Sequence, residues 1–166
     1  MSITDDLAKI ALQEETLTLN EFDANTAWRL GTRLREMAIS RGHGLVIDIR
    51  RFGQQLFYSA LAGTTPNNPD WARRKGNVVA HFHRSSYGMG LELELKNISL
   101  EERYALPFGE YAAHGGSFPI RVVHAGVIGS ITVSGLPQRA DHELIVEALC
   151  LETGRDYSVL RLTPEA

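Results

Sequence analysis

The sequence is poor in cysteine and in net charge, and it has no long apolar run. Cys150 is the only cysteine among 166 residues, which excludes an internal disulfide and gives no sign of an oxidising compartment. The formal net charge is -3, too weak to indicate a nucleic-acid partner. No apolar stretch approaches the roughly 20 residues that cross a bilayer, and the acidic start of the chain does not resemble a signal peptide. We therefore expect a soluble, cytoplasmic protein that binds neither nucleic acid nor membrane.

The common catalytic signatures are missing as well. There is no Gly-x-Gly-x-x-Gly after a strand, no Walker loop, no His-Glu-x-x-His and no Gly-x-Ser-x-Gly. Gly129-Ser130 and Ser134-Gly135 fall in an expected strand with no obvious base nearby, so nucleophilic catalysis is unsupported. Cys150 lies beside the apolar stripe of the expected last helix, which indicates a small core residue. The sequence leaves open whether the protein is an enzyme.

What is present indicates one α+β domain over residues 1–166. The composition is ordinary for a globular protein, with 43% hydrophobic and 22% charged residues. Apolar periodicity and capping residues predict helices and strands in a mixed order. The expected helices are 3–11, 26–40, 68–86, 99–104 and 141–151, and the expected strands are 17–19, 45–49, 56–61, 118–123 and 127–133. Two hairpins and a lone strand favour an antiparallel sheet flanked by helices.

Some positions carry more specific expectations. Asp48 lies inside the apolar run 45–49 and is expected to face outward. Asp141 is expected to cap the last helix. The run 89–96 alternates leucine with glutamate, which suits a strand, but it could equally extend the preceding helix; we leave this open and favour the helix.

The segment 68–86, NPDWARRKGNVVAHFHRSS, has two interpretations. A strand would put His81 and His83 on one face, as metal ligands would be. A helix would give one apolar stripe headed by Trp71 and would point the two histidines about 200° apart. The segment is long for a strand and has helix start signals at Pro69 and Asp70. We favour the helix and predict no metal site.

The C-terminal half resembles a known family. "GGSFPIRV", then "GVIGSITVSGLP" and "DHELIVEAL", are similar to the haem-degrading domain family of GlcG/HbpS-like proteins, and "WARRKGNVVAHFHRSSYGMG" resembles the lysine-containing central helix of that group. With "YAAHGGSFPI" added, the sequence is most similar to a branch of uncharacterised proteins. The likeness runs from about Leu45 to the end. It implies a profilin-like core and a homo-oligomer.

A candidate ligand site surrounds the Gly115-Gly116 pair. Two glycines let backbone amides approach a ligand closely and can form an anion-binding nest. A hydroxyl follows at Ser117, and Arg121 would add a charged fork for a carboxylate or phosphate if it shares that face. Arg73, Arg74 and Lys75 form a basic cluster near the start of the expected central helix. The alternative is that the glycines only turn the chain and the arginines are solvated.

Haem would require an iron ligand, and six histidines are available. His124 sits at a hairpin turn and His142 in the first turn of a helix, so both are expected to be exposed. The family-like motifs place His83 and His114 beside the expected pocket. No Cys-Pro or Cys-x-x-Cys-His is present to hold haem covalently. The predicted ligand-binding set is Arg74, Lys75, His83, His114, Gly115, Gly116, Ser117 and Arg121.

Three functions follow in order of preference. The first is a protein that binds a small planar or anionic molecule, with haem as one candidate. The second is an oligomeric protein-interaction module without catalytic activity. The third, implied by the family resemblance alone, is a haem-degrading enzyme.

Overall fold

A five-stranded sheet forms the centre of the protein in a computed structural model that describes residues 2–164. The strands are β1 (Thr18–Leu19), β2 (Val46–Arg51), β3 (Gln54–Ala60), β4 (Ser117–Val122) and β5 (Gly126–Ser134), in the spatial order β1-β4-β5-β2-β3. The α+β class with a helix-flanked sheet is confirmed. The sheet is not wholly antiparallel as predicted, because the two-residue β1 pairs parallel with β4.

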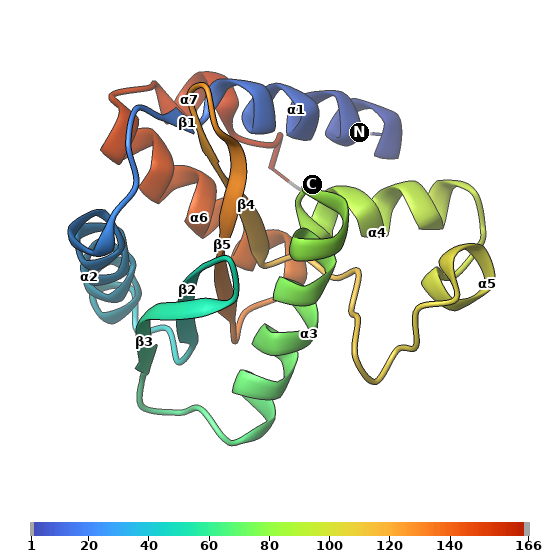
Figure 1. Ribbon diagram of the computed structural model, residues 1–166, viewed down its shortest axis with the longest axis horizontal. Coiled ribbons are helices and arrows are strands. Elements are labelled where there is room, and N and C mark those ends of the chain that lie inside the picture. Colours follow the sequence, from blue (N-terminus) through green and yellow to red (C-terminus); the bar gives the residue numbers. More distant parts are fainter. Residues whose placement is uncertain (1, 165–166) are drawn as a thin grey trace.

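Helices cover both faces of this sheet (Figure 1). They are α1 (Ile3–Thr16), α2 (Ala24–Ser40), α3 (Asn67–Phe82), α4 (Ser86–Leu95), α5 (Leu100–Tyr104), α6 (Gln138–Thr153) and α7 (Tyr157–Leu160). The main core lies between the sheet and the pair α2 and α6, where Leu30, Ile47, Phe118 and Ile145 are almost fully buried. The single helix α3 crosses the other face. No helix in the described part of the chain is both long enough and apolar enough to span a membrane.

The two ambiguous segments are helical. The segment around Trp71 forms α3, as favoured, and its residues Val78 and Val79 are fully buried. The alternating leucines and glutamates belong to α4, because Leu91 and Leu93 are buried against different neighbours. Leu91 packs with Ile10 of α1, and Leu93 packs with Val78 of α3. A helix enclosed on two sides therefore needs no single apolar stripe.

Two predicted exposures are wrong. Asp48 is only 5% exposed, because it lies on the sheet face covered by α3, where Arg50 Nε donates to its carboxylate at 2.9 Å. His142 is fully buried, and its ring lies between those of Tyr87 and Phe118, with centroid separations of 5.2 and 5.7 Å. The prediction for His124 is correct, since this residue is exposed, and Cys150 is a buried core residue as expected.

Asp141 does not cap α6 in the predicted way. The helix begins after Pro137, which makes no side-chain cap, and Asp141 lies in the first turn with 2% exposure. Its carboxylate accepts hydrogen bonds from the backbone N–H groups of Leu136 at 3.0 Å and Gly135 at 3.3 Å. It therefore fixes the turn between β5 and α6, and this position brings it close to α3.

Candidate functional site

The Gly115-Gly116 pair lies where the loop before β4 passes between α3 and the start of α6. A Cβ atom at Gly115 would collide with the backbone carbonyl of Gln138, and one at Gly116 would collide with the Lys75 ammonium. Gly116 also has φ = +129°, a backbone conformation that side-chain-bearing residues rarely adopt. Both glycines are therefore required by close packing of this loop.

Lys75 holds this loop in place from α3. Its ammonium donates to the backbone carbonyls of Gly115 at 3.0 Å and Val133 at 2.8 Å, and to Asp141 Oδ2 at 3.1 Å. The residue is only 3% exposed. Burial lowers the pKa of Lys75 and raises that of Asp141, while the attraction between the two charges opposes both shifts. We refer to these contacts as the Lys75 clamp. All three donors of the ammonium have partners, so its role here is structural.

Arg74 fixes the other part of the loop. Its guanidinium lies 4.1 Å from the ring centroid of Trp71 and 5.0 Å from that of Phe108. Its Nε donates to Asp70 at 3.1 Å, and Nη1 donates to the carbonyl oxygen of Phe108 at 3.2 Å. The side chain is almost fully buried. Arg74 therefore places Phe108 beside α3 and contributes positive charge next to His114.

His114 is the exposed member of this group. Its ring meets the edge of Trp71 at a centroid separation of 5.3 Å and that of Phe108 at 6.1 Å. Partial desolvation lowers the pKa of His114, and the positive charges of Lys75 and Arg74 lower it further. The imidazole is therefore neutral around pH 7, and a neutral ring nitrogen can ligate a metal or accept a hydrogen bond.

Two hollows meet at His114 and Gln138. The first, which we call the His114 pocket, has a volume of about 290 Å³. Its lining residues come from α3, the Gly-Gly loop and the β5–α6 turn and include Asn67, Asn68, Trp71, Lys75, Gly135 and Asp141. The second hollow, of about 430 Å³, lies against α4 and α5 and includes Phe108 and Tyr111. A ligand centred on His114 could extend into either hollow.

The remaining predicted site residues lie elsewhere. Ser117 is fully buried, and its hydroxyl is 2.8 Å from that of Thr132. Arg121 lies further along β4, opposite Thr18 of β1, and lines neither of the two hollows at His114. His83 ends α3 with a left-handed backbone conformation and lines a different cavity. The structure thus brings together Arg74, Lys75, His114, Gly115 and Gly116 and separates His83 and Arg121 from them.

Sequence reasoning missed several residues that shape this site. Trp71 was placed on the buried stripe of α3, yet it also forms a wall of the His114 pocket. Phe108 and Gln138 lie in or beside loops, where periodicity gives no signal. A buried lysine requires an acidic partner, so Asp141 could have been identified once Lys75 was known to be buried. Within residues 2–164, no group of three or more histidine, cysteine, aspartate or glutamate side chains is arranged to hold a metal ion.

Residues 22–150 match the family model described as haem degrading protein HbpS-like. An uncharacterised UPF0303 protein of Acidobacterium capsulatum is 60% identical over 166 residues, covering 100% of both chains. A UPF0303 protein of Burkholderia pseudomallei is 60% identical over 163 residues, covering 98% of this chain and 99% of the relative.

Several solved structures share the fold, and three of them are similar over most of the chain. The Ybr137w protein has a TM-score of 0.83 at 28% identity and covers 89% of this chain and 87% of its own. HbpS has a TM-score of 0.62 at 16% identity, covering 83% and 94% of the two chains. A PduOC:heme complex has a TM-score of 0.67 at 14% identity, covering 78% and 93%. At these last two identities the likeness concerns the fold alone.

Proposed function

The chain belongs to the HbpS-like family of haem degrading proteins, and we propose that it binds a small planar, anionic molecule at His114, with haem as the first candidate. The single observation that carries this proposal is the solvent-exposed imidazole of His114, which contacts the rings of both Trp71 and Phe108. The lowered pKa of His114 favours the neutral ring that a metal ligand requires. A structural neighbour was solved as a haem complex, which supports haem as the first ligand to test.

The residues around His114 have the chemistry needed to contact one face of a haem. Imidazole is a usual axial ligand of haem iron, and aromatic rings can pack against a porphyrin edge. Bound haem would supply redox-active iron. His114 would hold the iron, and Trp71 and Phe108 would contact the macrocycle. The guanidinium of Arg74, which lies against these two rings, would attract the acidic groups of the haem. Among residues 2–164, His114 is the histidine that lines the two hollows, so we propose that it would hold the iron.

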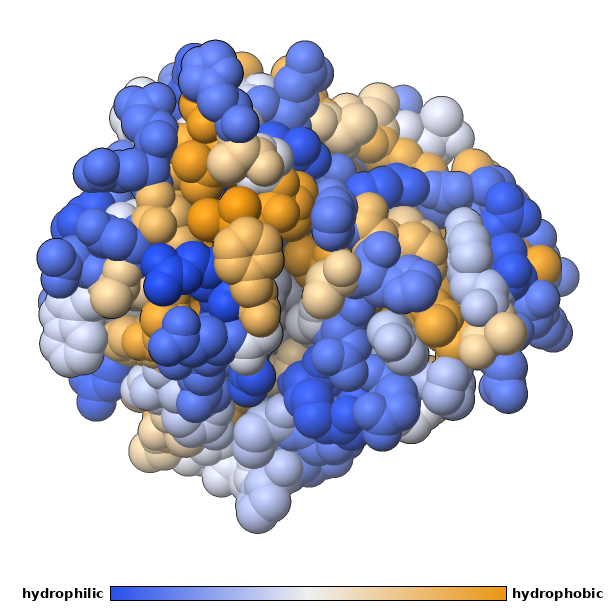
Figure 2. All heavy atoms as spheres, in the orientation of Figure 1, coloured by the Kyte–Doolittle hydropathy of each residue, from blue (hydrophilic) through white to orange (hydrophobic). Residues whose placement is uncertain are grey.

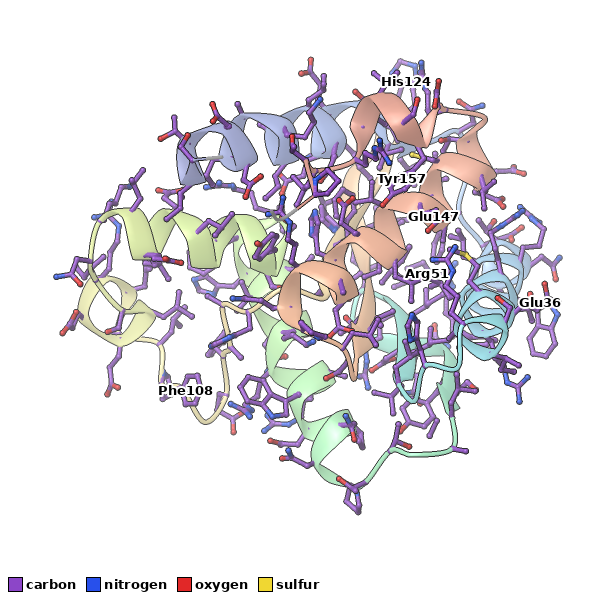
Figure 3. The ribbon with its side chains drawn as sticks, turned by 180° about the vertical axis from the view of Figure 1, so that it is seen from behind. Glu36, Arg51, Phe108, His124, Glu147 and Tyr157 are labelled. Atoms are coloured by element: carbon purple, nitrogen blue, oxygen red, sulfur yellow. The ribbon has the colours of Figure 1, made fainter. Side chains whose placement is uncertain are left out.

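The experiment is a hemin titration followed in the Soret region. We expect a shifted, saturable band with the native protein and its loss in the His114→Ala variant. His83→Ala and His124→Ala are matched controls, because His83 lies in a different cavity and His124 at the far end of the molecule from Phe108 (Figure 3). A band that is unchanged in His114→Ala, or no band with native protein, would overturn the proposal.

Tryptophan fluorescence gives an independent measurement. The chain has two tryptophans, and Trp28 is 64% exposed on α2, whereas Trp71 lines the His114 pocket. In a Trp28→Phe variant, all tryptophan emission comes from Trp71. We expect hemin to quench this emission with the same concentration dependence as the Soret change.

An oligomeric interaction protein is the second candidate. Trp28 and Ile39 of α2 and Leu151 of α6 are large apolar residues with exposed fractions of 64%, 52% and 54%. Such residues are common at interfaces between copies, and we propose a cytoplasmic homo-oligomer. Sedimentation analysis of the native protein and of Trp28→Glu tests this: a monomer in both cases would refute it.

A further inference from the structure

A third cavity lies on the other side of α3, and its lining is unlike that of the His114 pocket. It is enclosed by α3, the β2–β3 hairpin and β5 and has a volume of about 280 Å³. We call it the α3 cleft. The lining includes Asp48, Arg50, Phe52, Gly76, Asn77, His83, Ile128, Ser130 and Thr132. Its size is close to the lower end of the range for ligand pockets, so it suits a small molecule.

The floor of the cleft carries polar groups that are buried in the sheet. Asp48, Ser130 and Thr132 have exposed fractions of 5%, 7% and 2%. The Asp48 carboxylate accepts from Arg50 Nε at 2.9 Å and from Gln55 Nε2 at 3.3 Å, and Thr132 bonds to Ser117. The Ser130 hydroxyl has no hydrogen-bond partner within residues 2–164. This hydroxyl is therefore free to form a hydrogen bond with a molecule that enters the cleft.

The opposite wall is made of small residues of α3. Ala72, Gly76 and Ala80 follow one another at intervals of four and therefore share one side of the helix. A Cβ atom at Gly76 would lie 3.5 Å from Thr132 Oγ1 and 3.9 Å from Ser130 Oγ, both ordinary contacts. An alanine would therefore fit here sterically. The missing methyl group leaves room directly above the two hydroxyls.

The charges around the cleft nearly cancel. Asp48 pairs with Arg50 inside it, and Arg73 at its rim pairs with Asp70 at 3.0 Å and Glu110 at 2.7 Å. An ionised ligand would thus find no uncompensated charge among these pairs. The lining combines a carboxylate, which only accepts hydrogen bonds, with guanidinium groups, which only donate. Ligand hydroxyl groups can satisfy both, because each donates one hydrogen bond and accepts others.

One side of the mouth of the cleft is apolar. Phe52 at the tip of the β2–β3 hairpin is 80% exposed, and Val127 and Ile128 line the cavity beside it. Figure 2 shows hydrophobic atoms gathered above α3, over the β4–β5 end of the sheet, with hydrophilic atoms around them. An apolar side of the mouth next to a polar floor matches a ligand that has a C–H face and several hydroxyl groups.

We propose that the α3 cleft is a second binding site for a small, uncharged molecule with adjacent hydroxyl groups, of monosaccharide size. Ser130 and Asp48 contact its hydroxyl groups, and Phe52 covers its C–H face. This site is independent of ligand binding at His114, and Ser130 and Asp48 do not line the His114 pocket.

The test uses saturation-transfer-difference NMR with D-ribose as the probe, and with acetate and methylammonium as charged probes. We expect ribose signals from the native protein and none above background from the charged probes. Equal signals from the charged probes, or no ribose signal, would overturn the proposal.

Two variants locate the binding. Ser130→Ala removes a hydroxyl that has no protein partner, so urea unfolding should be unchanged while the ribose dissociation constant rises about fivefold. Gly76→Ala adds a methyl group inside the cleft while improving helix propensity, and it should weaken ribose by about tenfold or more without loss of stability. If both variants bind ribose like native protein, the site is not the α3 cleft.

Ser134→Ala is the matched control. Ser134 lies on the same strand and the same face as Ser130, is 5% exposed and lines the His114 pocket instead. This variant should keep ribose binding. Conversely, Ser130→Ala should keep hemin binding, so failure of one proposal is distinguishable from failure of the other. A second copy of the chain is the alternative occupant of the cleft. In that case native protein would not bind ribose, Gly76→Ala would change the sedimentation coefficient, and the proposal would fail.

Discussion

Acidification should destabilise the fold through His142, which is fully buried in α6. Its Nε2 atom lies 2.7 Å from Gln13 Oε1, and the Gln13 amide nitrogen donates to the carbonyl oxygen of Leu160. The amide oxygen of Gln13 therefore faces the ring, which makes Nε2 the protonated nitrogen. The other nitrogen, Nδ1, has no hydrogen-bond partner among the described residues. A second proton would have to sit on this atom.

The surroundings of His142 oppose that second proton. Burial lowers the pKa of His142 to about 3, and the nearby positive charge of Arg139 adds to the effect. In the unfolded chain the pKa is about 6.5. Between these two values the unfolded state binds a proton that the native state does not, so stability falls as the pH falls from 6.5 toward 3.

The size of the effect follows from the two pKa values. Relative to a residue that does not titrate, His142 lowers the free energy of unfolding by about 1 kcal/mol at pH 5.5 and by about 3 kcal/mol at pH 4.5. At pH 7.5 the loss is negligible, because the histidine is neutral in both states. For a urea m-value of about 2 kcal/mol/M, the pH 5.5 effect shifts the unfolding midpoint by about 0.5 M.

The assay compares native protein with His142→Gln by urea unfolding at pH 7.5, 6.5, 5.5 and 4.5. Glutamine can donate to Gln13 but does not titrate. The contributions of all other titrating groups therefore cancel when the free energies of unfolding of the two proteins are subtracted at each pH. We expect the native curve to fall more steeply by the amounts above, and ring NMR signals of His142 should show no protonation at pH 4.5. Parallel curves, or a protonated ring at pH 4.5, would refute the reasoning.

Three further outcomes are expected from stability and reactivity measurements. Gly116→Ala should cost roughly 2–5 kcal/mol in urea unfolding, because the added Cβ meets the Lys75 ammonium at a left-handed φ; a loss under 1 kcal/mol would contradict this. Lys75→Met should cost about 3–5 kcal/mol by leaving Asp141 buried without its counter-ion, and adding Asp141→Asn should restore part of the loss. Burial raises the pKa of Cys150 to about 11, so a thiol reagent at pH 8 should label native protein far more slowly than urea-unfolded protein; equal rates would refute this.

Local sequence signals predicted much of the fold. The α3 helix was identifiable because Pro69 and Asp70 mark its start and Val78 and Val79 continue one stripe. The final hairpin was also predictable from its alternating pattern. The parallel pairing of β1 was not, because a two-residue strand has no periodicity and its partner lies about a hundred residues away.

The candidate site was predictable only in part. Gly115, Gly116, His114 and the basic cluster were found because glycine pairs and clustered charges are local features. The burial of His142 was missed because it depends on Gln13, a partner 129 residues away. Asp48 was misjudged for the same kind of reason. Alternation places it on one face of β2, but only the position of α3 shows that this face is covered.

The Lys75 clamp also bears on how fast the protein unfolds. Its three acceptors lie 40, 58 and 66 residues from Lys75 along the chain, so the clamp can form only after α3, the Gly-Gly loop, β5 and α6 have met. We expect such a contact to be absent from the transition state for folding. The clamp should therefore mainly lower the unfolding rate, so that the native state lives longer while the refolding rate stays the same.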